Sequence, residues 1–423
     1  MTLNQYQLPY GKSFLNFSIE EEHVQQVLMP NKVMKLKDPK QEIINALRRP
    51  IDSLPLKEIV KPGETVIIVV NDITRLTRSE VFLPLIIDEI NEAGIPDDQI
   101  KIIFSTGTHK PQTFEEQESI VGPEIAQRIA MYDHKCDEDE NHVYVGTTSR
   151  GNKVLINKMV MEADRIIITG GTNLILNAGY SGGRKAIFPG VCHRSTIDFN
   201  HKFMFDSPLA TDGVLDGNPI HEDMIEGCRF VNPDFMLNVI LDEDKDIVGV
   251  VAGHWEKAHR EGCKIVDKIY KVELKEKADI VIASCGGFPK DIDFRQAHKG
   301  QENAYKAMKP DGMVILAAQC PHGHGDSTFY DYMIKYPCHL EMERQLKEKF
   351  QVGPHKAFWV ARLASLGKTY LVSEMSEEVV KNLMIHPVKS IEEALKIGYE
   401  KYGDNPSICF MPYASFTLPV IDQ

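Results

Sequence analysis

The sequence of Arg165–Gly190, RIIITGGTNLILNAGYSGGRKAIFPG, joins a buried strand to a glycine-rich loop and indicates the fold of the chain. Its three consecutive isoleucines end at the glycine pair 170–171, as in a buried strand that runs into a loop. The glycine-rich run 179–183 then leads into Arg184 and Lys185. Backbone N–H groups of successive glycines can surround an anion, and the basic pair adds charge. The stretch therefore predicts either a phosphate-binding loop or a tight turn whose charges face solvent. The spacing of its glycines matches neither the Walker A nor the Rossmann motif, so the pattern alone does not decide between the two.

Length and composition indicate a globular protein of two domains. The 423 residues exceed one ordinary core, and 43% hydrophobic and 26% charged residues are typical of water-soluble proteins. The net charge of −13 argues against nucleic acid or an anionic membrane as a partner. No apolar run is long enough to cross a bilayer and the N-terminus lacks the features of a secretion signal, so we expect a cytoplasmic protein. The eight cysteines form no C-x-x-C pair, which predicts free and mostly buried thiols.

Strand and helix patterns alternate along the first 270 residues. Strands are expected at 14–19, 66–70, 101–104 and 166–168, hairpins within 143–156 and 235–251, and helices after Asp38 and over 79–93. Asp38 is a suitable N-cap because Pro39 and Glu42 follow it in the first turn. A helix over about 254–271 has no strand signal and suits a link between domains.

The alternation restarts after this linking helix, as a second domain would require. Strands are expected at 279–283, 313–317, 370–372 and 407–410, and helices at about 293–308, 339–350, 377–383 and 391–402. We therefore predict an α/β fold of two domains, each with a mostly parallel sheet flanked by helices. The N-terminal domain is expected over residues 1–265 and the C-terminal domain over 266–407, with the tail of about 408–423 able to pack back on the first domain.

Four polar or basic loops follow predicted strands, at 71–75, 106–110, 179–185 and 285–299. Open parallel sheets bind ligands at the carboxyl ends of their strands, so these loops are the candidate binding site. His109 ends the second loop, where a neutral imidazole can accept a hydroxyl proton near pH 7. A loop histidine bonded to backbone groups is the alternative.

A second basic group lies on a predicted helix. Arg295 and Lys299 are spaced i, i+4, with Gln296 beside Lys299, so the two cations fall on one helix face. Their repulsion would be offset by a bound carboxylate; the alternative is a solvated basic face. Trp359, one of two tryptophans, either walls a pocket or fills a core.

Together these motifs resemble the nickel-dependent lactate racemase family, over essentially the whole chain. The resemblance rests on five pieces in the same order: NDITR at 71–75, STGTH at 105–109, GYSGGRKAIFPG at 179–190, the downstream His201, and DIDFRQAHK at 291–299. Several motifs in order are more specific than any one of them.

The resemblance implies a nickel-pincer nucleotide, a pyridinium-3,5-bisthiocarboxylic acid mononucleotide that carries nickel, in the cleft between the two domains. Its nickel is held by two sulfurs, a ring carbon and a protein histidine. Lys185 matches the lysine of the covalent thioamide link, and His201 matches the nickel ligand. The resemblance places four further residues around the cofactor: Asp72, Gly182, Gly183 and Trp359. Soft sulfur donors with imidazole suit nickel.

The implied reaction is hydride transfer from C2 of a 2-hydroxy acid to the cofactor, with His109 as the base for the hydroxyl proton. Arg75, Gln296 and Lys299 would hold the substrate carboxylate while the planar 2-oxo acid turns. The implied partners are the small-molecule 2-hydroxy acid and the proteins that make the cofactor.

The chain departs from the family pattern at two positions. Family members carry a second catalytic histidine where this chain has Ile175, and isoleucine cannot accept a proton. The lactate enzymes have an aromatic residue where this chain has Arg295, and a second cation suits a longer or dianionic substrate.

We therefore predict a racemase or epimerase of a 2-hydroxy acid other than lactate. The alternative within enzymes is a one-base hydride-transfer enzyme, a 2-hydroxyacid/2-oxoacid oxidoreductase or transhydrogenase that uses the same cofactor. A third hypothesis, a cofactor-free binding or carrier protein, would be favoured by loss of Lys185 or His201, and both are present.

Overall fold

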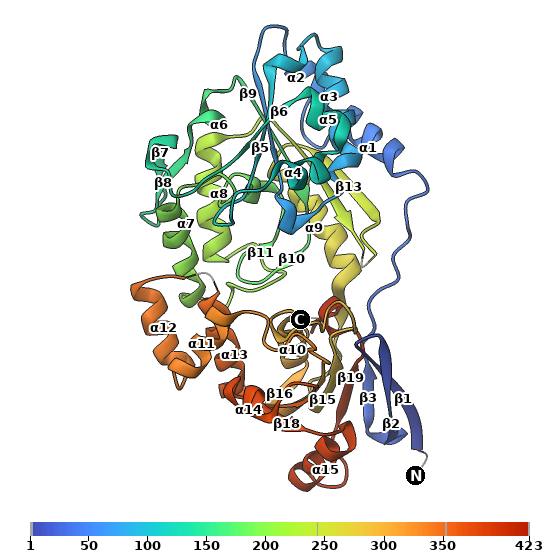
Figure 1. Cartoon of the computed structure of the whole chain (residues 1–423). Coiled ribbons are helices and arrows are strands. Elements are labelled where there is room, and N and C mark those ends of the chain that lie inside the picture. Colours follow the sequence, from blue (N-terminus) through green and yellow to red (C-terminus); the bar gives the residue numbers. More distant parts are fainter. Residues whose placement is uncertain (1–2, 243, 352, 422–423) are drawn as a thin grey trace. The chain divides into compact units, whose positions relative to one another are not determined.

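A six-stranded sheet organises residues Val33–Asp267, which form the unit that we name the central unit. The computed structural model describes residues 3–242, 244–351 and 353–421 (Figure 1). Across the sheet the strands are β13 (Ile247–Gly253), β12 (Phe235–Leu241), β9 (Arg165–Gly171), β4 (Val66–Val70), β5 (Ile100–Phe104) and β6 (Ala130–Asp133). All neighbours are parallel except β12 and β13, so one antiparallel strand lies at an edge.

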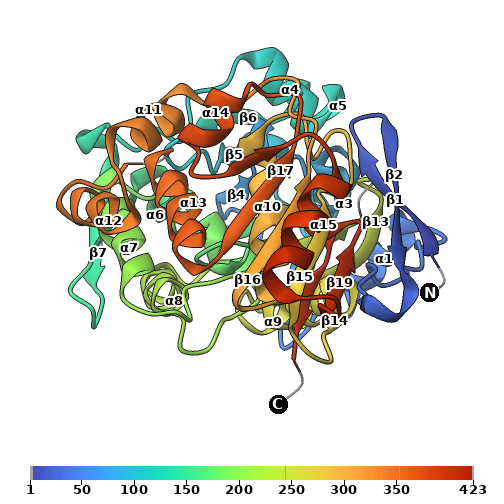
Figure 2. The ribbon, with the colours of Figure 1, turned by 90° about the horizontal axis from the view of Figure 1, so that it is seen from below.

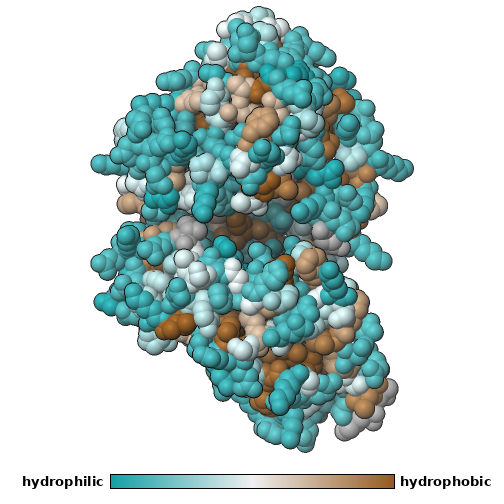
Figure 3. All heavy atoms as spheres, viewed as in Figure 1, coloured by the Kyte–Doolittle hydropathy of each residue, from teal (hydrophilic) through white to brown (hydrophobic). Residues whose placement is uncertain are grey.

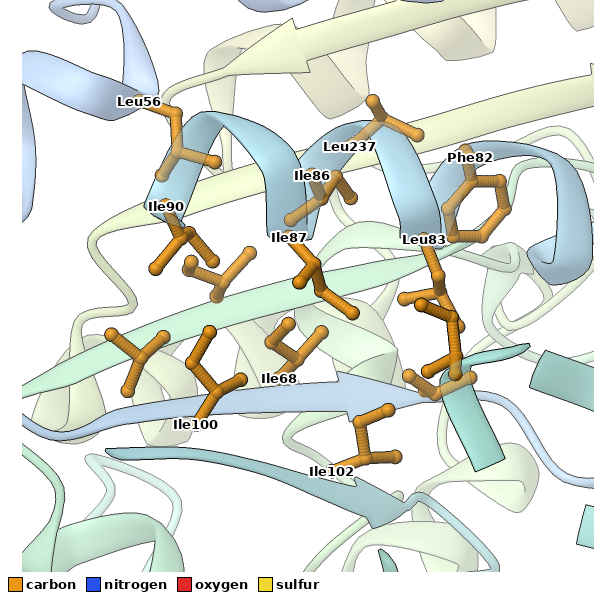
Figure 4. Close-up of a cluster of buried hydrophobic side chains, with 14 of the residues drawn as sticks. Leu56, Ile68, Phe82, Leu83, Ile86, Ile87, Ile90, Ile100, Ile102 and Leu237 are labelled. Atoms are coloured by element: carbon orange, nitrogen blue, oxygen red, sulfur yellow. The ribbon is translucent and has the colours of Figure 1, made fainter. Parts of the chain in front are cut away.

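Helices cover the central sheet because its strands are apolar on both faces. All five residues of β4 are buried, as expected for a strand inside a parallel sheet. Helix α3 (Ser79–Glu92) buries Phe82, Ile86 and Ile90 against the sheet, with Ile87 on the same side (Figure 4). Leu83 of the same helix is also buried, whereas Leu85 is only partly buried. This packing supplies the core that holds the carboxyl ends of the strands in place.

The remaining elements of the central unit are shorter. Its hairpins are β7 (His142–Thr147) with β8 (Lys153–Asn157) and β10 (Leu174–Ile175) with β11 (Gly179–Tyr180). Its other helices are α1 (Pro39–Arg48), α2 (Leu56–Ile59), α4 (Phe114–Val121), α5 (Pro123–Arg128), α6 (Lys158–Glu162), α7 (Arg194–His201), α8 (Pro219–Val231) and α9 (Lys257–Tyr270), which runs past the end of the unit. Short 3-10 helices are η2 (Ile73–Arg75), η3 (Asp97–Gln99), η4 (Asp139–Asn141), η5 (Gly183–Ala186) and η6 (Lys202–Phe205). The predicted N-cap of α1 is confirmed: the Asp38 carboxylate accepts a hydrogen bond of 3.0 Å from the Gln41 N–H.

The second unit, named the terminal unit, contains residues Met1–Lys32 and Lys268–Gln423. Its six strands are all parallel, in the order β18 (His386–Val388), β17 (Lys368–Val372), β16 (Met308–Ala317), β15 (Ala278–Ser284), β19 (Ile408–Met411) and β3 (Val24–Val27). Smaller pairings join β1 (Leu3–Tyr10) to β2 (Ser13–Glu20) and β14 (Lys271–Glu273) to β20 (Leu418–Val420). The helices are α10 (Phe294–Lys306), α11 (Ser327–Lys335), α12 (His339–Glu348), α13 (Pro354–Leu366), α14 (Glu377–Asn382), α15 (Ile391–Tyr402), η1 (Glu21–His23) and η7 (Ala414–Phe416).

Alternate residues of the terminal sheet face opposite layers, as the two-residue period of a strand requires. Ile280 and Ile282 of β15 pack with Leu395 of α15 and Phe17 of β2 in one core cluster. Helix α15 crosses β15 and β16 in Figure 2. Each unit is thus an α/β assembly, which confirms the predicted fold class.

The division of the chain differs from the predicted domains at both termini. Residues 1–32 were expected in the N-terminal domain, but β3 pairs with β19 and they belong to the terminal unit. The tail was expected to be able to pack on the first domain, but β19 pairs with β15 and β20 with β14, both in the terminal unit. Pairing between strands from the two ends of the chain leaves no local pattern, so these boundaries cannot be read from periodicity.

The predicted state of the cysteines is confirmed. All eight are free, and seven of them are buried. Hydrophilic residues cover most of the face shown in Figure 3. Within the described residues, no helix combines the length and the apolar composition needed to cross a membrane.

Candidate active site

A histidine–aspartate pair lies at the carboxyl ends of β4 and β5. His109 Nδ1 is 2.5 Å from Asp72 Oδ2, and Asp72 is only 2% exposed. The other oxygen, Asp72 Oδ1, accepts bonds from the Thr74 N–H at 3.0 Å and the Thr74 hydroxyl at 2.7 Å. Burial alone would raise the pKa of Asp72, but the bonds from His109 and Thr74 hold it below its usual value. An ionised Asp72 fixes the Nδ1–H tautomer of His109 and leaves Nε2 as the proton acceptor.

The loop that carries His109 is fastened on both sides. The Thr106 hydroxyl donates to the His134 carbonyl at 2.5 Å, and the His109 N–H donates to the Thr106 carbonyl at 2.9 Å. The Gly107 N–H donates to the Gly190 carbonyl at 3.0 Å, which ties this loop to the end of the Arg165–Gly190 stretch. His109 is therefore held by an ordered loop with its side chain one-third exposed. Such a position is suited to a general base.

Lys185 lies in η5 among other cations. Burial, followed by the charges of Arg75 and Arg184, holds its pKa well below the usual value of a lysine. Within the described residues Lys185 forms no ion pair, so no carboxylate stabilises its charged form. A lysine in these surroundings carries more of the neutral amine, which is its nucleophilic form.

Gly182 and Gly183 are held more closely by the protein than the anion cradle or exposed turn considered from the sequence requires. The Gly183 N–H donates to Asn238 Oδ1 at 2.8 Å, so this donor already has a partner in the protein. Both glycines have positive φ, 77° and 53°, and a Cβ atom at Gly183 would lie 2.5 Å from His259 Cγ. The two glycines are thus required by backbone conformation and close packing.

The arginine of this loop is also not a solvent-facing charge. Arg184 is fully buried, and its guanidinium donates to the Ala178 carbonyl at 2.7 Å. It also lies 3.3 Å from His259 Nε2. Burial lowers the pKa of Arg184 to about 10. The loop therefore places Lys185 beside a buried and anchored arginine.

His201 is the last residue of α7 and lies close enough to Lys185 and Arg75 for their charges to act on it. Its Nδ1–H donates to the Ile197 carbonyl at 2.8 Å, which places the lone pair on Nε2. Burial first, and then the charge of Lys185, lowers the pKa of His201 to about 4. The imidazole is therefore neutral at physiological pH, the state in which it binds a metal.

His201 does not belong to a protein-only metal site among the described residues. The groups of three or more potential ligands found there are Glu20, Glu22 and His23, and Asp242, Asp244 and Asp246. A metal at His201 would thus need its other donors from a bound cofactor.

A pocket of about 240 Å³ opens beside Arg75. It lies among the residues that follow β4 and β9, with Val239 and Leu241 of β12 in its wall. Ile175, at the position where the family pattern has a second histidine, lines this pocket. The residues that line the pocket together with Ile175 carry no carboxylate and no imidazole. None of these lining residues can therefore serve as a second base.

The other predicted substrate residues belong to the terminal unit. Asp293 caps α10 by accepting the Gln296 N–H at 2.8 Å, and Gln296 is exposed while Lys299 is half-buried. Arg295 does not carry an isolated charge, because one of its terminal nitrogens is 3.6 Å from Asp326 Oδ2. The second cation that the sequence suggested is therefore partly balanced within this unit.

Trp359 lies on α13 and is 8% exposed. Its ring packs edge-on against Phe358, with centroids 5.2 Å apart, and the Arg362 guanidinium lies 5.0 Å from its centroid. Its indole Nε1 is buried and has no hydrogen-bond partner among the residues that the structure describes. This unpaired donor distinguishes Trp359 from an ordinary core residue.

Four residues that position the site were missed in the sequence. They are Thr74, which bonds Asp72, Thr106, which anchors the His109 loop, and Asn238 and His259, which hold the glycine loop. The Asp72-x-Thr74 pattern was the one local signal, since aspartate often caps a turn through the residue two positions on. The other partners are distant in sequence and leave no such signal.

Comparison with known proteins agrees with these features. Residues 10–213 match the model of the lactate racemase N-terminal domain, and residues 273–415 match that of the lactate racemase C-terminal domain. A lactate racemase of Thermoanaerobacterium thermosaccharolyticum is 34% identical, covering 96% of this chain and 97% of that protein. A lactate racemase of Lactiplantibacillus plantarum is 30% identical over the same shares.

A solved structure gives the same result in three dimensions. The lactate racemase apoprotein from T. thermosaccharolyticum matches with a TM-score of 0.88 and 33% identity, covering 99% of this chain and 100% of that one. Both family models, both relatives and this structure support a racemase. The chain therefore belongs to the lactate racemase family.

Proposed function

We propose that the protein is a racemase or epimerase of a 2-hydroxy acid other than lactate, dependent on a nickel-pincer nucleotide. One observation carries the proposal: Lys185, without an ion pair among the described residues and with a lowered pKa, lies near a neutral His201. A nucleophilic amine and a metal-binding imidazole are the two protein groups that such a cofactor needs.

The residues present fit this cofactor. Lys185 Nζ would form the thioamide link, and His201 Nε2 would complete the coordination of nickel. When bound, the cofactor supplies a hydride acceptor. Gly182, Gly183, Asp72 and Trp359 remain assigned to its surroundings, although the engaged N–H of Gly183 argues against a direct phosphate contact by that residue.

His109 would take the proton of the 2-hydroxyl group at Nε2. Asp72 would keep His109 in the required tautomer and stabilise the imidazolium. Arg75, whose guanidinium is exposed, would hold the carboxylate, and we assign Gln296 and Lys299 to the same group. Holding the carboxylate throughout keeps the intermediate bound.

A second candidate function is favoured by the surroundings of Ile175. The side chains that line its pocket include no group able to accept a proton near neutral pH. A one-base enzyme of this kind would interconvert 2-hydroxy and 2-oxo acids, as an oxidoreductase or transhydrogenase with the same cofactor. Incubating the holoenzyme with one enantiomer separates the two: racemisation without release of a 2-oxo acid would exclude the one-base enzyme.

Intact-mass measurement after co-expression with the cofactor-making proteins tests the central proposal. The wild-type chain should gain the mass of the cofactor, and Lys185→Ala should not. Lys153→Ala, at an exposed strand position, is the matched control and should keep the adduct. Absence of an adduct on wild-type protein, with confirmed cofactor synthesis, would refute the enzyme and favour a carrier protein.

Nickel content tests the second cofactor residue. His201→Ala should lose most of its nickel while folding normally, because the imidazole contributes a ligand but little to the core. His322→Ala, at an exposed loop histidine, should keep the wild-type nickel content. Equal nickel in both variants would contradict the assignment of His201.

Two further assignments accompany the proposal. The protein would receive its cofactor from the biosynthetic proteins, and we place it in the cytoplasm, where these and its 2-hydroxy acid would be found. Fractionation of cells that produce the protein, with detection by antibody, checks the second assignment.

A further inference from the structure

The pocket beside Ile175 lies where the order of the central sheet reverses. From β4 the chain proceeds to β5 and β6 on one side, and it then crosses to β9 and β12 on the other side. The neighbours β4 and β9 therefore define the switch point of the sheet, where the connections leave in opposite directions and open α/β sheets bind their ligands. Asn71, Arg75 and Thr77 follow β4, while Thr172 and Ile175 follow β9, and all five line the pocket.

Most of the uncharged polar residues of this pocket are bonded within the protein through at least one side-chain atom. The bonds are Asn71 Nδ2 to the Arg75 carbonyl, Thr77 to Ser79, Thr172 to Asn238, Ser181 to the Gly171 carbonyl, and the Leu174 N–H to Asn173 Oδ1. The rest of the lining is apolar, contributed by Leu76, Leu174, Ile175, Val239 and Leu241. The pocket thus offers a ligand mainly hydrocarbon surface.

Arg75 is the exception in the lining. Within the described residues its guanidinium forms no ion pair, and its charge acts on Asp72, the partner of His109. A ligand with a carboxylate at Arg75 and a hydroxyl at His109 would therefore have the apolar pocket next to its remaining substituent. A second carboxylate there would lose hydration against a mainly apolar lining, which is unfavourable.

We propose that this pocket binds the side chain of the substrate, and that the substrate is a 2-hydroxy monocarboxylic acid with a branched aliphatic or aromatic side chain. The inference rests on the proposed function, whose substrate class it narrows. The volume of about 240 Å³ exceeds what the methyl group of lactate would fill and approaches the roughly 300 Å³ of small ligand sites. Arg295 suggested either a longer substrate or a dianionic one. The apolar lining of the pocket favours the longer substrate.

The test compares four acids on the holoenzyme: lactate, 2-hydroxy-4-methylpentanoate, 2-hydroxy-3-phenylpropanoate and 2-hydroxybutanedioate. Wild-type kcat/KM should be at least about tenfold higher for the second or third acid than for lactate, since a methylene group in an apolar pocket changes discrimination by about that factor or more. Preference for lactate or for the dicarboxylate would overturn the proposal.

Variants of Ile175 locate the effect. Ile175→Trp should reduce the preference for the larger acids over lactate by at least about tenfold, whereas Ile175→Ala should shift preference towards the bulkier acid. Val143→Trp, on another two-stranded hairpin of the central unit, is the matched control and should leave the ratios unchanged. Unchanged ratios in both Ile175 variants would overturn the proposal. The two variants are expected to shift the substrate preference in opposite directions, which poor folding of a variant would not produce.

Two further readouts separate this proposal from the proposed function. The intact mass of Ile175→Trp should still show the adduct on Lys185; loss of the adduct would mean that the pocket holds the cofactor, and would overturn the side-chain assignment alone. Calorimetry on the cofactor-free chain should give a lower Kd for 2-hydroxy-4-methylpentanoate than for lactate. An adduct missing from wild type refutes the proposed function, while equal Kd values count against the pocket.

Discussion

The loops that follow β5 and β9 both lie at the carboxyl ends of the central strands, on either side of β4, and their side chains differ in chemistry. The loop after β5 carries His109, bonded to a buried carboxylate. The loop after β9 leads to Ile175, which lines an apolar pocket. One flank of β4 thus offers a proton acceptor and the other offers hydrocarbon.

This difference shows that the sheet sets the position of a site but not its chemistry. Parallel strands bring both loops to one edge, whatever side chains they carry. The side chains then decide what each flank can do: His109 with Asp72 can accept a proton, and Ile175 cannot. A racemase built on this frame must work asymmetrically or obtain its second proton acceptor from elsewhere.

Removing the base should have the largest effect on the comparison. His109→Ala should lower kcat by about 10³, because general-base catalysis contributes about 10² to 10⁴. Activity of the cofactor-loaded variant is the measurement, with loading checked by intact mass. Lys110→Ala, at the next and exposed residue, should retain activity. A loss below tenfold in His109→Ala would mean that the base is another group.

Weakening the support of the base should have an intermediate effect. Asp72→Asn keeps the shape but removes the charge that fixes the tautomer of His109, so kcat should fall by about 10². The adduct on Lys185 should stay at the wild-type level, because Asp72 bonds His109 and Thr74 rather than Lys185. If KM rises while kcat is unchanged, Asp72 acts on substrate binding and not on the base.

Making the two flanks alike should have a smaller effect in the opposite direction. Ile175→His places an imidazole in the apolar pocket and supplies a second proton acceptor. Racemisation of lactate should rise by about tenfold, and release of any 2-oxo acid should fall. Ile175→Gln, polar but not a base, is the matched control. An equal gain in both variants would show that polarity alone limits turnover.

The smallest effect concerns the loop that holds His109. His134, whose carbonyl accepts the Thr106 bond, is fully buried, and burial lowers its pKa from 6.5 to about 4. Above pH 6.5 the residue is neutral in the folded and unfolded chains alike. Between pH 6.5 and 4 only the unfolded chain binds the proton, so the free energy of unfolding should fall by at most about 3 kcal/mol.

Urea unfolding at several pH values between 7.5 and 4 measures this dependence. His134→Gln, which can still donate to the Cys192 carbonyl that His134 Nε2 bonds at 2.9 Å, should reduce the slope in that interval. Part of the pH dependence of the unfolding free energy should remain in this variant because other histidines are also buried. Burial lowers the pKa of His259, for example, to about 3. The same slope in wild type and variant would show that His134 is not a source of the acid sensitivity.

Much of the fold was predictable because it follows local periodicity. The apolar run of β4, the range of α3 and the cap at Asp38 follow from short-range signals, and each lies in the structure close to its predicted position. The linking helix and the second set of strands also lie close to their predicted positions. The boundary predicted after residue 265 lies close to the observed division after Asp267, but the placement of the termini was not predictable, since β3 and β19 pair from opposite ends of the chain.

Some features of the candidate site could likewise be predicted from the sequence, and others could not. Lys185, His201 and the motifs around them could be recognised in the sequence and pointed to the lactate racemase family, and Ile175 could be recognised there as a departure from its pattern. The roles of Gly183 and Arg184 were not, because their partners Asn238 and His259 lie 55 and 75 residues away. Arg295 likewise needed the structure, which places Asp326 beside it.

The sequence by itself determined the alternation of strands and helices and the chemical groups available at the ends of the strands. Only the tertiary structure decided that Asp72 meets His109 across 37 residues, that Lys185 lies among cations, and that Ile175 lines a pocket at the switch point. The reason is physical. Periodicity and capping act over a few residues, whereas hydrogen-bond partners, desolvation and pocket walls arise from segments that meet only when the sheet has formed.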